Sequence, residues 1–160
     1  MPMVQTFEGG HPRFLFQVNI VDDGQAAIYM VQAYGLAAVN FVKEAVLKSG
    51  MTITLEAKRR CPVDTGRLRA SIGMWDGSNL IKENAEASPE DAVWELTDNN
   101  LNLKVGTNVW YAWDVETKPA HHITGQMGFM KAGADASMER IVRYFQLALK
   151  KAEAGAGGIT

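Results

Sequence analysis

The residues of this chain that could do chemistry begin with Asp64-Thr65-Gly66, the tripeptide of aspartic proteases. In those enzymes two carboxylates share one proton, so a chain with a single copy would have to dimerise. Here the tripeptide follows Cys61-Pro62 at an expected helix end and precedes Arg67, whose charge lowers carboxyl pKa values and disfavours a shared proton. We therefore interpret the tripeptide as a structural turn, with a single-motif aspartic protease of the retroviral type as the alternative.

Cys61, His121 and His122 are the remaining candidates for catalysis or metal binding. A histidine could activate the thiol of Cys61, but the negative end of a helix dipole raises a thiol pKa, so we expect a small buried side chain instead. The two histidines, with Asp114 and Glu116 nearby, could hold a metal ion. Adjacent histidines point apart on a strand, however, and no further ligand spacing follows. We expect no catalytic residue, no metal and no cofactor.

Cations and aromatic residues offer two possible contacts with nucleic acid. Five cations lie within twelve positions: Lys58, Arg59, Arg60, Arg67 and Arg69. They could bind phosphate, but we favour a solvated helix end whose cations pair with carboxylates of an adjoining subunit. Bases could stack on Trp110, Tyr111 and Trp113. Without flanking cations, these aromatic residues are more typical of a core or an interface.

Composition limits the class of protein. The 160 residues fit one domain, 1–160, in which we expect residues 1–10 and 154–160 to be extended or frayed. One cysteine excludes an internal disulfide framework, no apolar run approaches the ~20 residues of a membrane span, and the start lacks a signal-peptide pattern. The net charge is −2. These features indicate a soluble intracellular domain and give no support for a whole-protein nucleic-acid binder.

A long helix is expected from Gly24 to Arg60. Asp22 can cap it, and apolar or small residues recur every three or four positions along one face: Ile28, Val31, Gly35, Val39, Val42 and Val46. Gly35 on this face predicts close approach of another element, and Ser49-Gly50 predicts a bend. At 1.5 Å per residue the helix would be about 55 Å long. Since a compact domain of this size does not need so long a helix, we expect a partner outside the domain to cover part of the helix.

The patterns after this helix predict strands joined by turns. Pro62 ends the helix, residues 64–66 form a turn, and alternation predicts a strand from 68 to 74. The polar, acidic stretch 76–91 is expected to be an exposed loop. Two strands, 92–97 and 101–105, flank a turn at 98–100. A further strand is expected at 13–20. Residues 109–116 fit a strand or a helical turn, and 118–129 fit a loop.

A second helix closes the chain and completes the predicted fold. It runs from 136 to 152, is capped by Asp135, and is expected to bury Met138, Ile141, Phe145 and Leu149. The predicted fold class is therefore α+β, with a long N-terminal helix and a C-terminal helix packed on a small antiparallel β-sheet.

Three blocks of the sequence point to a known family. Residues 57–72 read AKRRCPVDTGRLRASI. The turn and the family motif in this block consist of Pro62, Val63, Asp64, Thr65, Gly66, Leu68 and Arg69. A second block contains Gly106, Thr107, Tyr111, Ala112 and Glu116. A third, Gly128-Phe129-Met130, precedes the closing helix. Together these blocks, over roughly residues 25–150, resemble the neck or tail-completion proteins of tailed bacteriophages, minor tail components of the siphophage head-tail joining type.

The first block is similar to the family stretch A-K-x-x-A-P-V-D-T-G-x-L-R-x-S-I, and the second to V-G-T-x-x-x-Y-A-x-x-V-E. The sequence departs from the family pattern in four places. Cys61 replaces alanine, Thr117-Lys118 stands where the family has a Phe-Gly-Thr turn, the last block lacks a proline beside Met130, and 76–91 resembles an insertion.

The resemblance implies a structural virion protein. Such proteins form a ring of identical subunits, here expected to be a hexamer or dodecamer, that joins the head connector to the tail and leaves a lumen for DNA. The alternative is a tail terminator-like ring that caps the tail tube. Implied partners are a second copy of the chain, a head-closure or connector protein, a tail terminator or tail tube protein, and transient, non-specific DNA, with no membrane.

The expected location is the neck of the virion, after assembly in the host cytoplasm. As candidate subunit contacts we predict Gly35, Arg59, Arg60, Arg67, His121 and His122. Segments 1–10, 76–91 and 118–128 are expected to dock on the rings above and below.

Overall fold

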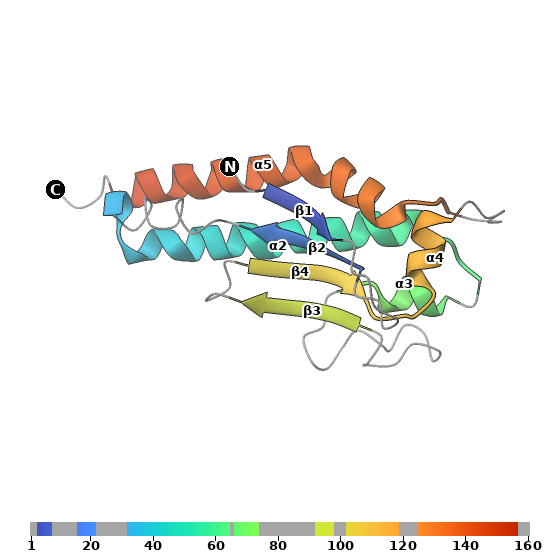
Figure 1. Ribbon diagram of the computed structural model, residues 1–160. Coiled ribbons are helices and arrows are strands. Elements are labelled where there is room, and N and C mark those ends of the chain that lie inside the picture. Colours follow the sequence, from blue (N-terminus) through green and yellow to red (C-terminus); the bar gives the residue numbers. More distant parts are fainter. Residues whose placement is uncertain are drawn as a thin grey trace.

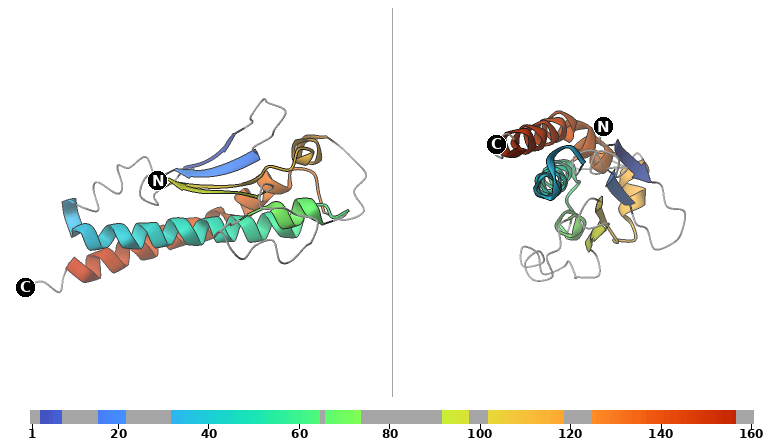
Figure 2. Two further views of the ribbon diagram at one scale, coloured as in Figure 1. Left: turned by 90° about the horizontal axis from the view of Figure 1, so that it is seen from below. Right: turned by 90° about the vertical axis from the view of Figure 1, so that its left-hand side faces the viewer.

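Two long antiparallel helices form the largest part of the structure, and a four-stranded sheet lies on one side of them (Figures 1 and 2). This computed structural model describes residues 3–7, 16–21, 32–64, 66–73, 92–97, 102–118 and 125–156. In chain order the elements are β1 (Met3–Phe7), β2 (Phe16–Val21), α2 (Leu36–Arg60), α3 (Arg67–Ser71), β3 (Ala92–Thr97), β4 (Asn102–Thr107), α4 (Ala112–Thr117) and α5 (Phe129–Ala156).

Small side chains let α2 and α5 pack closely. The buried positions along their contact are mostly alanine and serine: Ala38, Ala45, Ser49 and Ala57 on α2, and Ala134, Ser137, Ala148 and Ala152 on α5. The hydroxyls of Ser49 and Ser137 each donate to the carbonyl four residues earlier, at 2.7 Å, so neither leaves an unpaired polar group in the interface. The two helices approach closely at Gly133, where an added Cβ would lie 2.7 Å from the backbone N of Ala57.

The boundaries of α2 follow from its terminal residues. Gly35 precedes it with φ 81°, a left-handed angle that interrupts the helical path. Cys61 follows it with ψ 129°, as expected for a residue before proline, and three cations in the last turn face the carbonyl end. The expected start at Gly24 lies outside the described residues, but the expected unbroken helix is wrong: residues 32–34 are helical, Gly35 interrupts them, and α2 begins at Leu36 and is about 38 Å long. The expected bend is also absent, because α2 runs without a break through Ser49 and Gly50.

The sheet has strand order β1-β2-β4-β3, and each neighbouring pair is antiparallel. Both β2 and β3 align with β4 in the same register, so that Phe16 and Ala92 each lie opposite Thr107. Leu103 and Val105 of β4 are buried against α2, where an added Cβ at Gly50 would meet both side chains. The predicted strands at 92–97 and 101–105 are confirmed, and that at 13–20 is found as β2.

The predicted fold class needs correction. The molecule is mostly helical. Of the strands, β4 alone has side chains whose burial the structure describes. The two long helices are not both packed on a sheet. Instead α5 packs mainly on α2, and it is α2 that contacts β4. The physical reason is the run of small residues on both helices, which makes a helix-on-helix core possible.

Two local predictions are also wrong. Residues 67–71 form the helix α3 rather than a strand, because Gly66 turns the chain with a left-handed φ of 88° and its carbonyl then accepts the backbone N–H of Ala70 at 2.9 Å. The closing helix begins at Phe129, seven residues before the expected start, and Asp135 pairs with Lys131 at 2.7 Å instead of capping it.

The predicted buried face of the closing helix is only partly right. Ile141 is fully buried and Phe145 packs against the core. Met138 and Leu149 are 36% and 38% exposed, because the face that meets α2 is centred on the smaller residues beside them.

Several predictions concern residues that lie outside the described part of the chain: 1–2 and 8–10 of the N-terminal segment, Asp22, Ile28 and Val31 of the expected long helix, Thr65, the 76–91 loop, the 98–100 turn, His121, His122 and 157–160. Residues 154–156, expected to be frayed, belong to α5.

Candidate functional site

The sequence blocks that resemble the phage family meet at one end of the structure, where α2 ends and α5 begins (Figure 1). We call this region, residues 60–73, 105–118 and 125–131, the motif end. Ser71 of the first block and Thr107 of the second share a hydroxyl–hydroxyl hydrogen bond of 2.6 Å. The backbone N–H of Gly73 donates to the carbonyl of Gly106 at 3.2 Å, and that of Val109 to Thr107 Oγ1 at 3.1 Å. The bonds of Ser71 and Gly73 attach α3 and the residues after it to the end of β4.

Glu116, the last residue of the second block, holds the start of α5. Its buried carboxylate accepts the backbone N–H groups of Met130 at 3.1 Å and Lys131 at 3.2 Å, and its carbonyl accepts that of Gly128 at 2.9 Å. The first N–H groups of a helix have no partner within the helix, so Glu116 satisfies two of them from another element. Burial raises the pKa of Glu116, opposed by its hydrogen bonds to the α5 backbone.

We expect Glu116→Ala to lower the free energy of unfolding by about 1–3 kcal/mol, because it leaves the N–H groups of Met130 and Lys131 without an acceptor. Glu116→Gln keeps one acceptor oxygen and should lose less. Chemical denaturation measures both, with Asp114→Ala as control, since Asp114 is an exposed carboxylate of the same helix that pairs with Lys118. Equal losses for Glu116→Ala and Asp114→Ala would contradict this assignment.

The segment before α5 packs against the turn after α2. Gln126 donates its backbone N–H to the carbonyl of Arg60 at 2.9 Å. Gly125 has φ 79°, and an added Cβ there would lie 2.6 Å from both Cys61 C and Pro62 Cα. Thus the Pro62 turn serves as a backbone surface on which the chain enters α5, in addition to ending α2.

Of the candidate catalytic groups, the structure describes Asp64 and Cys61 but not His121 or His122. Asp64 and Val63 lie exposed on the turn, Gly66 has a left-handed φ of 88° and precedes α3, and Thr65 is outside the described residues. Cys61 is buried, and burial raises its thiol pKa to about 12, the opposite of nucleophile activation. Within the described ranges no three His, Cys, Asp or Glu residues are grouped so that they could hold a metal.

The basic cluster is partly neutralised by a residue of the same chain. Glu56 is only 5% exposed and pairs with Arg60 at 2.5 Å, Arg140 at 3.0 Å and Arg59 at 3.3 Å. The hydrogen bond from Arg60 lowers the pKa of Glu56, helped by Arg140. Arg59 and Arg60, which we predicted as subunit contacts, bind Glu56 of their own helix, and Arg140 links α5 to α2 through the same carboxylate. Sequence analysis missed Glu56, although its spacing of three and four from these arginines signalled the pairing.

The Glu56 network predicts a pH dependence. Because its folded pKa lies below the ordinary 4.5, its stabilisation is present above pH 4.5 and is lost as pH falls through the folded pKa. We expect Glu56→Gln to lower the free energy of unfolding by roughly 1–2 kcal/mol at neutral pH, after allowance for screening at the exposed arginines, and by less in acid. Denaturant unfolding across this pH range tests the prediction, with the exposed Glu139→Gln as control. A loss independent of pH would contradict it.

The other predicted site residues lie around these contacts. Leu68 and Ala112 are buried, and Tyr111 and Trp113 are half-buried against the core, whereas Trp110, Arg69 and Gly35 are exposed. Trp110 meets Tyr111 edge-on, with ring centroids 5.4 Å apart. Tyr111 and Trp113 therefore pack with the protein itself, whereas Trp110 is 65% exposed. Arg67 is half-buried at the start of α3.

Taken together, the fold and the motif end define a protein whose sequence motifs hold its own elements together. Residues 29–116, more than half of the chain, match a protein family described as "Bacteriophage HK97-gp10, putative tail-component". The chain belongs to this family of phage tail components, as its first two sequence blocks predicted, and has a structural, tail-related role in the virion. Neither the curated proteins nor the solved structures contain a match.

The matched range covers α2, α3, β3, β4 and all of α4 but Thr117, so the expected third block and α5 lie beyond it. A family of structural tail components also suggests a role without catalysis. As for membranes, none of the helices within the described ranges has the length and apolar character needed to cross one.

Proposed function

We propose that this protein forms a homo-oligomeric ring in the phage neck, between the head connector and the tail, with a central lumen through which DNA passes. The observation that carries the proposal is the use of the family motifs: Pro62, Thr107 and Glu116 contact other parts of the same chain rather than a shared reactive site. Residues that define a family and serve only its architecture support a role in assembly.

The proposed partners follow from this position. On one side the ring meets a head-closure or connector protein and on the other a tail terminator or tail tube protein. DNA would cross the lumen without being held, which suits a net charge of −2, because a surface that neutralised many phosphates would bind DNA tightly. A ring that caps the tail tube, as a tail terminator does, is the second candidate, since the family description names the tail and not the neck.

The experiment is deletion of the gene from a phage that encodes the protein, with electron microscopy of the particles and complementation by the wild-type gene. A neck ring predicts full heads and finished tails that remain unjoined, or heads that leak DNA. A tail terminator predicts tails of irregular, excessive length. Normal infectious particles without the protein would overturn both.

Complementation with Asp64→Asn separates assembly from proteolysis. Because Asp64 is exposed on the turn, we expect this variant to restore joined particles. A variant that folds and enters particles but leaves phage proteins uncleaved would instead support the aspartic protease.

A further inference from the structure

The side of the α2–α5 pair that faces away from the sheet carries two aligned stripes of side chains. On α2 the stripe is Glu44, Lys48, Met51 and Leu55, spaced i, i+4, i+7 and i+11, the repeat that keeps residues on one helical face. Lys48 and Leu55 lie roughly 140–160° around the helix from Gly50, which faces β4. This stripe therefore points away from the sheet.

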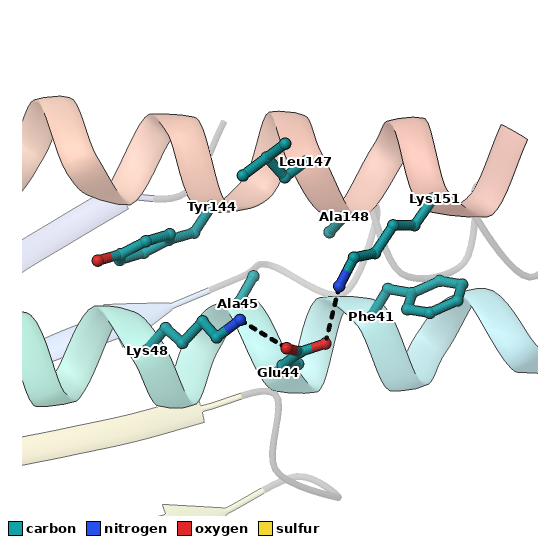
Figure 3. Close-up of a pocket in the computed structure, with 8 residues that line it drawn as sticks. All are labelled: Phe41, Glu44, Ala45, Lys48, Tyr144, Leu147, Ala148 and Lys151. Carbon is teal, nitrogen blue, oxygen red and sulfur yellow. Dashed lines mark hydrogen bonds and ion pairs between the residues drawn. The ribbon is translucent and has the colours of Figure 1, made fainter. Parts of the chain in front are cut away.

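The stripe on α5 has the same spacing: Arg140, Tyr144, Leu147 and Lys151. The two stripes run side by side in opposite directions, because Lys151 pairs with Glu44 at 3.4 Å and Tyr144 Oη lies 3.1 Å from Thr52 Oγ1. Figure 3 shows part of this surface, with the strands behind the helices and a groove of about 50 Å³ between Lys48, Leu147 and Lys151. We call the two stripes together the outer face.

The outer face combines exposed apolar side chains with positive charge. Leu147 is 55% exposed, Met51 51% and Leu55 48%. Its charged residues are Lys48, Lys151 and Arg140 against Glu44, which pairs with the two lysines, while Arg140 pairs with Glu56 of α2. Apolar side chains with a charged border are typical of the centre and rim of a protein interface. Duplex DNA is bound mainly through its phosphates by protein cations, and its backbone presents no comparable apolar surface.

The charge of the rest of the chain indicates what covers this face. The helices α2 and α5 carry ten Lys or Arg and five Asp or Glu, a net charge of +5. All other residues together carry six basic and thirteen acidic side chains, a net charge of −7. Two copies that met through their helix pairs would bring like charges together, whereas a head-to-tail contact brings opposite charges together. Such a heterologous contact generates a closed ring when its rotation closes.

We infer that the outer face is a heterologous subunit interface, covered in the assembly by the acidic part of a second copy of this chain. The inference rests on the proposed ring and goes beyond it by naming the surface and its orientation. Leu147, Met51 and Leu55 form its apolar centre, and the cations Lys48, Arg140 and Lys151 attract acidic residues of the neighbour.

The test is the mass of the full-length protein in solution, measured by light scattering after size exclusion over a concentration series. We expect wild type to form an oligomer larger than a dimer. Leu55→Ser/Leu147→Ser should raise its dissociation constant at least about tenfold, as loss of buried apolar anchors does. Raising the ionic strength from about 0.1 M to about 1 M, which shortens the Debye length from about 10 Å to about 3 Å, should also weaken it.

The matched control is Val142→Ser, which removes an apolar side chain of the same helix, 39% exposed but on another stripe. It should leave the mass unchanged, and thermal unfolding should show all variants folded. If Leu55→Ser/Leu147→Ser left the oligomer unchanged, the interface assignment would be wrong, but the proposed ring would not be contradicted. A wild type that stays monomeric at every concentration would overturn both the interface and the ring.

Gel-shift binding to duplex DNA gives the remaining outcome. If the serine variant keeps its oligomeric mass but loses salt-sensitive DNA binding that wild type shows, the outer face is a DNA contact and the interface assignment is wrong. If DNA binding is absent or equal in both proteins while the mass falls, the subunit interface is supported.

Discussion

Gly133→Ala is expected to destabilise the protein by about 1–3 kcal/mol, although alanine is the better helix former. The new Cβ would lie 2.7 Å from the backbone N of Ala57 and 2.8 Å from its Cα. Backbone atoms of a packed helix cannot rotate away as a side chain can. The helices α2 and α5 would therefore have to move apart by several tenths of an ångström, which loosens the small-residue contact along them.

The matched control for this change is Gly155→Ala in the same helix, where nothing lies within 4 Å of the new Cβ. It should be neutral or slightly stabilising, because only helix propensity changes there. Thermal and chemical unfolding of both variants measure the difference. If Gly133→Ala were as stable as Gly155→Ala, the close approach of α2 and α5 at Ala57 would be wrong.

Gly125→Ala is expected to cost roughly 2–4 kcal/mol, from two separate effects. Its φ of 79° is a left-handed angle that a side chain rarely adopts. In addition, the new Cβ would overlap the backbone of the turn after α2, at 2.6 Å from Cys61 C and from Pro62 Cα, and closer still to Pro62 N. The variant should therefore separate the segment before α5 from the Pro62 turn.

Gly128→Ala separates the two effects. Gly128 has a similar φ of 70°, but an added Cβ meets nothing within 4 Å. It should lose only about 1–2 kcal/mol, the cost of the left-handed angle. Denaturation midpoints of the two variants give the difference, which reports the overlap with Pro62. Equal losses of stability would mean that the segment 125–126 does not pack against the Pro62 turn.

The sequence predicted those elements whose signals are local. Pro62 marked the end of α2, and alternation marked the strands β3 and β4. It misassigned α3 because Leu68, Ala70 and Ile72 alternate as in a strand, while the left-handed turn at Gly66 lets the same residues start a helix. It also misjudged α5, since a hydrophobic pattern follows Met138 and Leu149 and overlooks the alanines that make close packing possible.

The candidate site was predicted in part. The blocks around Pro62, Thr107 and Glu116 were recognised as belonging together, but their contacts depend on chain segments many residues apart. The hydrogen bond between Ser71 and Thr107 joins positions separated by 36 residues, and no spacing rule within one element gives it. The pairing of Arg140 with Glu56, 84 residues away, has the same origin.

The contact between Gly133 and Ala57 lies near the N-terminal end of the long helix α5. Helix α5 continues 23 residues beyond Gly133, or about 35 Å at 1.5 Å per residue, so a tilt of about 5° there would displace its far end by about 3 Å. Small adjustments at this pivot would therefore be amplified at Leu147 and Lys151. Because Ala148 and Ala152 near the far end of α5 are buried, such a tilt would also repack that end, so the two ends of the α2–α5 contact constrain each other.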